Sequence, residues 1–424
     1  MRIRALPLAL FLAILLSPTF LSAYGVLSHE ELIDISWDSV IRPALLKRFP
    51  TASEDQVKQA HAYAYGGSLI QDMGYYPFGS HEFTNYLHYV RSGDFVAYML
   101  RDAGDINELA FALGALSHYA ADSWGHPAVN KGVAAVYPKL REKFGPVVTY
   151  EEDHEAHLQT EFSFDVVQVA KRRYLSLQYH DFIGFKVPQN LLERSFIDTY
   201  GIKPEQFLKH EDLSIGTFRF GVSRAIPEMT QVAVASRRID IPNEKNDQAR
   251  RQFLYQLSRA DYQKEFGTDY RGPGVFARIL GFLLRHLIPR FGPFRALNFK
   301  DPTAQTEDAY FKSMDNVEAE YRRLVQQVNE GNFKIPNRNL DVGDLTRAGQ
   351  YTLADQAYDD LVRRLAKNNF AHLTPDLKAS ILAYFDSGSA RDKLSRHKWK
   401  ETEEALAKLK AHPAAPSTDL EPQR

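Results

Sequence analysis

The stretch FALGALSHYAADSWGH, Phe111–His126, begins as an apolar helix and then carries polar residues at regular intervals. His118, Asp122 and His126 follow one another four residues apart, so an α-helix places them on one face. Imidazole and carboxylate side chains in such a stripe either hydrogen-bond within a core or bind a metal ion together. The stretch therefore predicts a closely packed helix with either a structural polar stripe or part of a metal site.

Helical periodicity continues through most of the 424 residues, whereas strand patterns are sparse. The segments between the periodic stretches are rich in Gly, Pro, Asn and Asp, as in residues 72–80 and 130–138. We therefore predict an all-α fold. Apolar residues recur at intervals of three and four in residues 28–49, 92–104, 106–124, 157–177, 306–332 and 345–369.

The composition argues against nucleic-acid binding by bulk charge and excludes both disulfides and cysteine zinc ligands. The chain has 52 Lys and Arg against 53 Asp and Glu, which argues against a protein held to nucleic acid by its bulk charge. It has no cysteine, so an exported form must be stabilised by its core or by metal rather than by disulfides. Any zinc ion must be held by His, Asp, Glu or backbone groups.

The N-terminus has the three-part layout of a secretory signal peptide. Basic Arg2 and Arg4 precede the short apolar run ALPLALFLAILL, and small residues follow up to Ala23. We predict that residues 1–23 are removed near Ala23 and that the mature protein is secreted or periplasmic. The alternative is an uncleaved membrane anchor, for which the apolar run is short.

The mature chain is predicted to have two parts and a tail. Polarity rises and the apolar pattern lapses at IDIPNEKNDQ, residues 239–248, where we place a boundary. Residues 24–240 form the predicted first domain, which carries the polar stripe. Residues 241–411 form a helical extension of unknown role, and residues 412–424 form a disordered tail.

Two further pairs of potential metal ligands occur in the first domain. His157 and Glu161 are four apart on a predicted helix, and a turn-rich segment between Asp72 and His81 allows both to fold back toward one ion. With the stripe they supply seven candidate ligands, more than one zinc ion needs. Sites with several zinc ions commonly act on phosphate esters, because two cations can clamp the attacking and leaving oxygens.

Cleavage after Ala23 would create a further candidate site at the new N-terminus. The free amine of Tyr24 and its own carbonyl could chelate zinc through a five-membered ring, and His29 follows closely in sequence. This ligand set would exist only after export.

Four motifs in one order resemble the zinc-dependent phospholipase C superfamily. They are YGVLSH at 24–29, DMGYYPFGSH at 72–81, HYAAD at 118–122 followed by His126, and HLQTE at 157–161. The superfamily includes bacterial phospholipases C, the fungal and plant single-strand nucleases, and the catalytic domain of the glycosylphosphatidylinositol-specific phospholipase D. The resemblance covers residues 24–165 and implies an all-helical catalytic domain with three zinc ions in a cleft.

Carried over by motif, the resemblance assigns ligands to the three ions. It implies that Asp122 bridges two of them and that Asp72 is also the general base. The first ion is assigned to Asp72, His81, His118 and Asp122, the second to His126, His157 and Glu161, and the third to the Tyr24 amine and carbonyl, His29 and Asp122.

Two of these ligand choices have alternatives. His88 is the alternative to His81, and His154 is the alternative to His157, although motif alignment favours His81 and His157. The chain also departs from the relatives at its mature N-terminus, because they usually begin with Trp at the place of Tyr24.

The resemblance implies a phosphodiester hydrolase that uses zinc-activated water, and we expect a phospholipase C with phospholipid as substrate. One alternative is a single-strand-specific nuclease, with nucleic acid as its partner. Another is a non-catalytic exported binding module stabilised by zinc. Residues 275–299 are apolar with interspersed arginines, which predicts either a membrane-surface contact or a core helix with solvated arginines.

Overall fold

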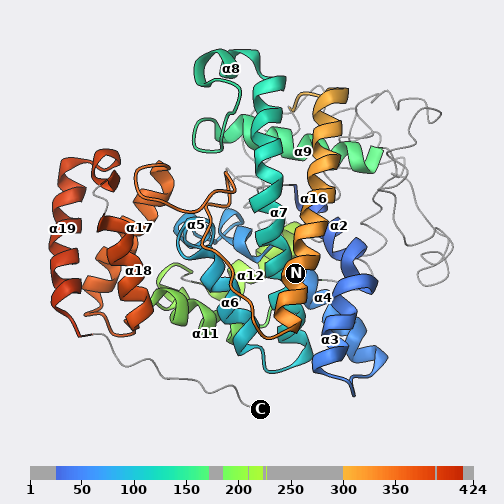
Figure 1. Cartoon of the computed structure of the whole chain (residues 1–424), viewed down its shortest axis with the longest axis horizontal. Helices are drawn as coiled ribbons and strands as arrows, with labels where there is room; N and C mark the ends of the chain where they lie inside the picture. Colours follow the sequence, from blue (N-terminus) through green and yellow to red (C-terminus); the bar gives the residue numbers. More distant parts are fainter. Residues whose placement is uncertain are drawn as a thin grey trace, which may run out of the picture.

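The computed structural model describes residues 25–170, 185–208, 210–222, 226, 299–386 and 389–413. These residues form helices joined by turns, and no strand occurs among them apart from an isolated bridge between Arg338 and Leu345. The prediction of an all-α fold is therefore confirmed (Figure 1). None of the helices described here combines the length and the apolar character that crossing a bilayer would require.

Most of the helices are short, and α7, with 31 residues, is the longest of those described. In chain order they are α2 (Val26–Ser36), η1 (Trp37–Ile41), α3 (Arg42–Arg48), α4 (Glu54–Gly67), η2 (Ile70–Tyr75), α5 (His81–Tyr89), α6 (Ser92–Asp102), α7 (Ile106–Val136), α8 (Pro138–Phe144), α9 (His154–Ala170), α11 (Gln189–Tyr200), η3 (Pro204–Gln206), α12 (Glu211–Phe220), α16 (Ala304–Asn329), α17 (Thr352–Lys367), α18 (Pro375–Asp386), η7 (Ser389–Lys393) and α19 (Arg396–Ala411).

Helix α7 runs through the middle of the molecule and is buried along most of its length (Figure 1). Asp105 caps its N-terminus, because Oδ1 accepts hydrogen bonds from the backbone amides of Asn107 and Glu108 at 2.8 and 2.9 Å. Gly114 lets α4 cross closely, since an added Cβ would overlap the carbonyl oxygen of Ala64. The close packing predicted for this stretch is therefore observed, and it holds the polar stripe in a fixed position.

Helix α16, from the C-terminal part of the chain, packs along α7. The hydroxyl of Tyr321 donates to the carbonyl oxygen of Leu113 at 3.0 Å, and Tyr321 belongs to the same apolar core as α7. Helices α17 and α19 pack on each other beside α5, where Tyr86 donates to Oδ2 of Asp360 at 3.0 Å (Figure 1). The predicted signal peptide, the boundary predicted at residues 239–248 and most of the predicted membrane-surface segment lie outside the described residues.

Residues 330–351 form the connecting segment between α16 and α17. The backbone amide of Leu340 donates to the carbonyl oxygen of His88 at 3.1 Å, at the end of α5. Gly93, at the start of α6, leaves room for the backbone of Pro336, because an added Cβ there would overlap it. The connecting segment therefore lies against helices that carry predicted ligands or flank them.

Candidate metal centre

The polar stripe of α7 is fully buried. The side chains of His118, Asp122 and His126 are 0% exposed. The Asp122 carboxylate lies between the two imidazoles, with Oδ2 3.0 Å from Nε2 of His118 and Oδ1 3.9 Å from Nε2 of His126. Ionisable side chains in this environment need compensating partners, because buried charge is costly unless it is paired or bound to metal.

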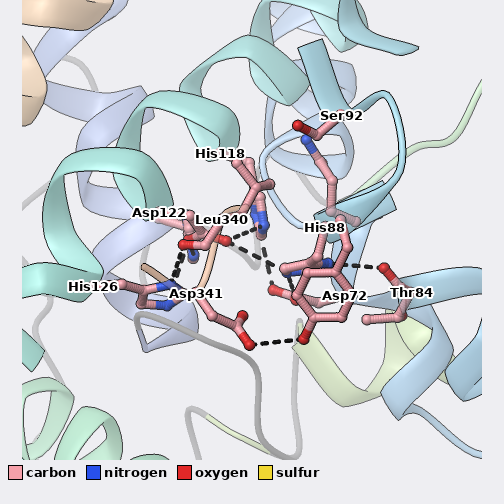
Figure 2. Close-up of polar contacts among 12 residues, drawn as sticks. Asp72, Thr84, His88, Ser92, His118, Asp122, His126, Leu340 and Asp341 are labelled. Atoms are coloured by element: carbon pink, nitrogen blue, oxygen red, sulfur yellow. Dashed lines mark hydrogen bonds and ion pairs between the residues drawn. The ribbon is translucent and has the colours of Figure 1, made fainter. Parts of the chain in front are cut away.

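A first group of candidate ligands joins α7 to α5 and η2. It consists of Asp72, His88 and His118, whose ligand atoms lie within 4.8 Å of one another. Oδ1 of Asp72 is 3.3 Å from Nε2 of His88, and Oδ2 of Asp72 is 3.8 Å from Nδ1 of His118. Nε2 of His88 also lies 3.4 Å from Oδ2 of Asp122, so the group reaches the middle of the stripe (Figure 2).

His81, the ligand that motif alignment favours on this helix, is not part of the group. Helix α5 begins at His81, whose exposed ring packs against Tyr75 and lines a surface cavity of about 800 Å³. His88 lies two turns further along the same face and is 0% exposed. The preference for His81 over His88 is therefore corrected, because α5 reaches the buried stripe only in its last turn.

A second group adds α2 to the centre. His29, His118 and Asp122 have ligand atoms within 4.8 Å of one another. Nε2 of His29 is 3.5 Å from Oδ1 of Asp122, and the rings of His29 and His118 stack with their centroids 4.3 Å apart. Tyr24, expected to ligate the same ion, lies just before the described part of the chain, so its role stays a prediction.

A third group joins α7 to α9. His126, His157 and Glu161 have ligand atoms within 4.8 Å of one another, and Oε1 of Glu161 is 2.7 Å from Nε2 of His157 and 3.4 Å from Nε2 of His126. His154, the alternative to His157, begins α9 and packs its exposed ring against Tyr150 instead. The geometry therefore favours His157, which motif alignment also favours.

Hydrogen bonds orient three of the imidazoles so that Nε2 faces the centre (Figure 2). Nδ1 of His88, His118 and His126 each donates to a backbone carbonyl oxygen, which leaves the lone pair of the neutral ring on Nε2. Within the described part of the chain, none of these Nε2 atoms and neither oxygen of Asp122 has a hydrogen bond of acceptable geometry, although all are buried. Such atoms are suitable donors for zinc. The carbonyl oxygens that accept these Nδ1 hydrogen bonds are, for His88, His118 and His126 in turn, those of Thr84 at 3.0 Å, Ser68 at 2.9 Å and Leu340 at 2.5 Å.

One comparison with known proteins matched the part of the chain that carries the candidate ligands. Residues 24–203 match the family model described as zinc dependent phospholipase C. This part of the chain belongs to the zinc-dependent phospholipase C family. Comparisons with curated proteins and with solved structures gave no match. All the candidate side-chain ligands lie within this phospholipase C domain, whereas the connecting segment lies outside it.

The carboxylates of the phospholipase C domain favour positive charge in the centre. Burial raises the pKa of Asp72. Burial also acts to raise the pKa of Asp122, but the imidazoles of His118 and His126 lower it well below its usual range. Burial acts to lower the pKa of His126, whereas the carboxylates of Asp122 and Glu161 raise it to about 9. The centre therefore stabilises cations, either protons or metal ions, beside its carboxylates.

Asp165 supports the helix that carries the candidate ligand His29 and was missed by the motif assignments. It lies one turn after Glu161 on α9 and accepts hydrogen bonds from the backbone amides of Leu27 and Ser28 at 3.1 and 3.2 Å. It thereby caps the first turn of α2, which carries His29. Its four-residue spacing from Glu161 is the sequence signal that could have identified it. Burial raises the pKa of Asp165 to about 8.

Proposed function

We propose that this protein is an exported zinc-dependent phosphodiesterase that hydrolyses the headgroup phosphodiester bond of phospholipids. The observation that carries the proposal is the convergence of buried imidazoles and carboxylates on Asp122, whose ligand atoms lie within 4.8 Å of one another in each group. Among the described residues, both oxygens of Asp122 and Nε2 of His88, His118 and His126 are buried there without a hydrogen bond of acceptable geometry. The family of residues 24–203 supports both the zinc chemistry and the phospholipid class of substrate.

Three zinc ions fit these groups once the shared residue His118 is assigned to one of them. Its single Nε2 lone pair can bind one ion, so we assign it to the group of Asp72 and His88, and Tyr24 would complete the group of His29 and Asp122. The first ion would be held by Asp72, His88, His118 and Asp122, the second by His126, His157 and Glu161, and the third by His29, Asp122 and the amine and carbonyl of Tyr24.

In this proposal, backbone carbonyls orient the imidazole ligands, and a carboxylate accepts a proton from the attacking water. Zinc supplies positive charge beside the phosphoryl oxygens and lowers the pKa of water toward neutrality. His88, His118 and His126 are held in place by their Nδ1 hydrogen bonds to the backbone. Asp122 is within 3.9 Å of four imidazoles. Asp72 lies 3.3 Å from Nε2 of His88 and 3.8 Å from Nδ1 of His118. We assign the role of general base to Asp72, as the resemblance to the phospholipase C superfamily implies.

The purified mature protein tests the proposal through its metal content and its substrate. We expect zinc by elemental analysis and hydrolysis of phosphatidylcholine vesicles, which a chelator abolishes and added zinc restores. A chromogenic choline phosphodiester and single-stranded DNA, assayed in parallel, separate a phospholipase from a nuclease. A zinc-bound protein that cleaves none of these substrates would instead be the non-catalytic binding module.

The variant Asp122→Asn tests the centre itself. It keeps the size of the side chain and removes the charge that the imidazoles surround, so we expect loss of zinc and a decrease in hydrolysis of at least about 100-fold. Asp212→Asn is the control, because Asp212 is an exposed carboxylate on α12. An Asp122→Asn protein with full zinc content and full activity would refute the proposed centre.

Export is the other half of the proposal, and residues 1–23 support it by their signal-peptide layout. We expect N-terminal sequencing of the secreted protein to begin at Tyr24. A protein that retains residues 1–23 would be membrane-anchored instead, and the nitrogen of Tyr24 would be an amide that cannot ligate zinc as an amine.

A further inference from the structure

One residue of the connecting segment contacts two candidate ligands that belong to different groups. The backbone amide of Leu340 donates to the carbonyl oxygen of His88 at 3.1 Å. Its own carbonyl oxygen accepts the Nδ1 hydrogen of His126 at 2.5 Å (Figure 2). Leu340 therefore links the last turn of α5 to the polar stripe of α7, although it lies well outside the phospholipase C domain.

The carboxylate of Asp341 fixes the position of this contact. It is 1% exposed, and its Oδ2 accepts hydrogen bonds from the hydroxyls of Tyr89 at 2.7 Å and Tyr351 at 2.6 Å. The backbone carbonyl of Asp341 accepts a hydrogen bond from the side chain of Asn130 at 2.8 Å. Tyr89 follows the ligand of α5 directly, and Asn130 lies one turn after the last ligand of α7. Asp341 is therefore hydrogen-bonded to Tyr89 and Asn130, which lie near the two candidate ligands that Leu340 contacts.

The backbone turn that follows Leu340 and Asp341 lies directly on α7. Gly343 has a positive φ of 79°, and an added Cβ would overlap the carbonyl oxygen of Ser123. The guanidinium of Arg338 donates to the carbonyl oxygen of Gly343 at 2.5 Å and lies over the ring of Trp124, 4.8 Å from its centroid. Only glycine fits at residue 343, so the turn is built for close contact with the helix that carries the stripe.

We infer that residues 339–343, which we name the Leu340 turn, are a positioning element of the metal centre. The Leu340 carbonyl keeps His126 in the tautomer whose Nε2 can bind metal, and Asp341 keeps that carbonyl in place. The inference rests on the proposed zinc centre and gives the helical extension a role in it. The ion that His126, His157 and Glu161 would hold should therefore depend on this turn more than the other ions would.

The test compares two carboxylates of the same segment in the full-length mature protein. Asp341→Ala removes the acceptor of both tyrosines, whereas Asp344→Ala removes an exposed carboxylate three residues away. Zinc is measured by equilibration against a series of chelator-buffered zinc concentrations. We expect Asp341→Ala to bind one zinc ion about 10- to 100-fold more weakly, with the remaining zinc retained. Asp344→Ala should match the wild type.

A second variant keeps the test decisive if Asp341→Ala fails to fold. Tyr89→Phe removes one of the two hydroxyl donors to Asp341 and leaves the ring in place, so the same ion should be weakened to a smaller extent. Variants that melt earlier but bind every zinc ion with wild-type affinity would overturn the inference alone. A wild-type protein without zinc would overturn the proposed function, and the inference with it.

Discussion

The positions of the candidate ligands on helices could be predicted residue by residue, because helical spacing fixes which side chains share a face. Asp122 is an example, since its neighbours four residues away on either side place it in the middle of a stripe. The choice between His81 and His88 could not be made in this way. The two residues lie seven apart on one face of α5, and only the position of that helix in the fold decides which one is buried.

His88→Ala and His81→Ala form a matched pair on one helix. Removal of the His88 imidazole should cost one zinc ion per chain and lower phospholipid hydrolysis by at least about 100-fold, because the first group loses a direct ligand. His81→Ala should retain its zinc, since that side chain is exposed. Elemental analysis and vesicle hydrolysis measure both effects. Loss of zinc from His81→Ala alone would restore the assignment that motif alignment favours.

Asp165 makes stability depend on pH. Its pKa is raised from 3.8 to about 8 in the fold, so the folded state binds this proton more tightly than the unfolded state does. The stabilisation is complete below about pH 4 and is lost as the pH rises to about 8. Asp165→Asn carries no titrating proton, so the melting temperature of the variant should fall less between pH 5 and pH 8 than that of the wild type.

Thermal melting at the two pH values checks this prediction, with chelator present in every sample so that zinc does not contribute. Asp212→Asn, an exposed carboxylate, should keep the pH dependence of the wild type. The same pH dependence in Asp165→Asn as in the wild type would show that this carboxyl group titrates normally in the fold.

At the scale of the element, α7 is longer than its sequence predicts. Residues 130–138 were expected to form a connector because of their turn-forming composition, but the helix continues to Val136. Val129 and Val133 are fully buried in an apolar cluster shared with α9 and α16. Burial against two other helices outweighs the low helix propensity of the stretch, and local composition carries no information about such packing.

The crossing of α4 over α7 gives a prediction for the same element. Gly114→Ala should destabilise the protein by about 1–3 kcal/mol or more, because the added methyl group overlaps the carbonyl oxygen of Ala64 and forces the helices apart. Urea denaturation measures the change in the free energy of unfolding. Gly216→Ala on α12 is the control, since an added Cβ there meets open space and should be neutral or stabilising. Equal stability of the two variants would contradict the close crossing.

At the scale of the whole molecule, the extension packs into the phospholipase C domain. Tyr321, Leu324 and Val325 of α16 are at most 2% exposed and share one apolar core with α7. Amphipathic periodicity predicted that α16 is a helix, but it could not predict which helix would cover its apolar face. The Leu340 turn was less predictable still, because it acts through backbone atoms that any residue type supplies.

A chain truncated after residue 240 should not give a soluble, cooperatively folding protein. Loss of α16 would expose the apolar face of α7 to water, and exposed apolar surface of this size favours aggregation. Soluble yield and a single thermal unfolding transition are the measurements. A chain truncated after residue 413 keeps every described helix and should behave as the full-length protein does. A soluble, cooperatively melting 24–240 fragment would show that the extension is dispensable for folding.

The distance in sequence between His126 and Leu340 sets an order of events during synthesis. The chain leaves the ribosome from its N-terminus, so all the candidate side-chain ligands emerge long before the carbonyl that orients one of them. A nascent chain that ends before residue 340 therefore lacks the backbone acceptor that orients His126. Under the proposed function, the zinc ion assigned to His126 would reach its full affinity only after most of the polypeptide has been made.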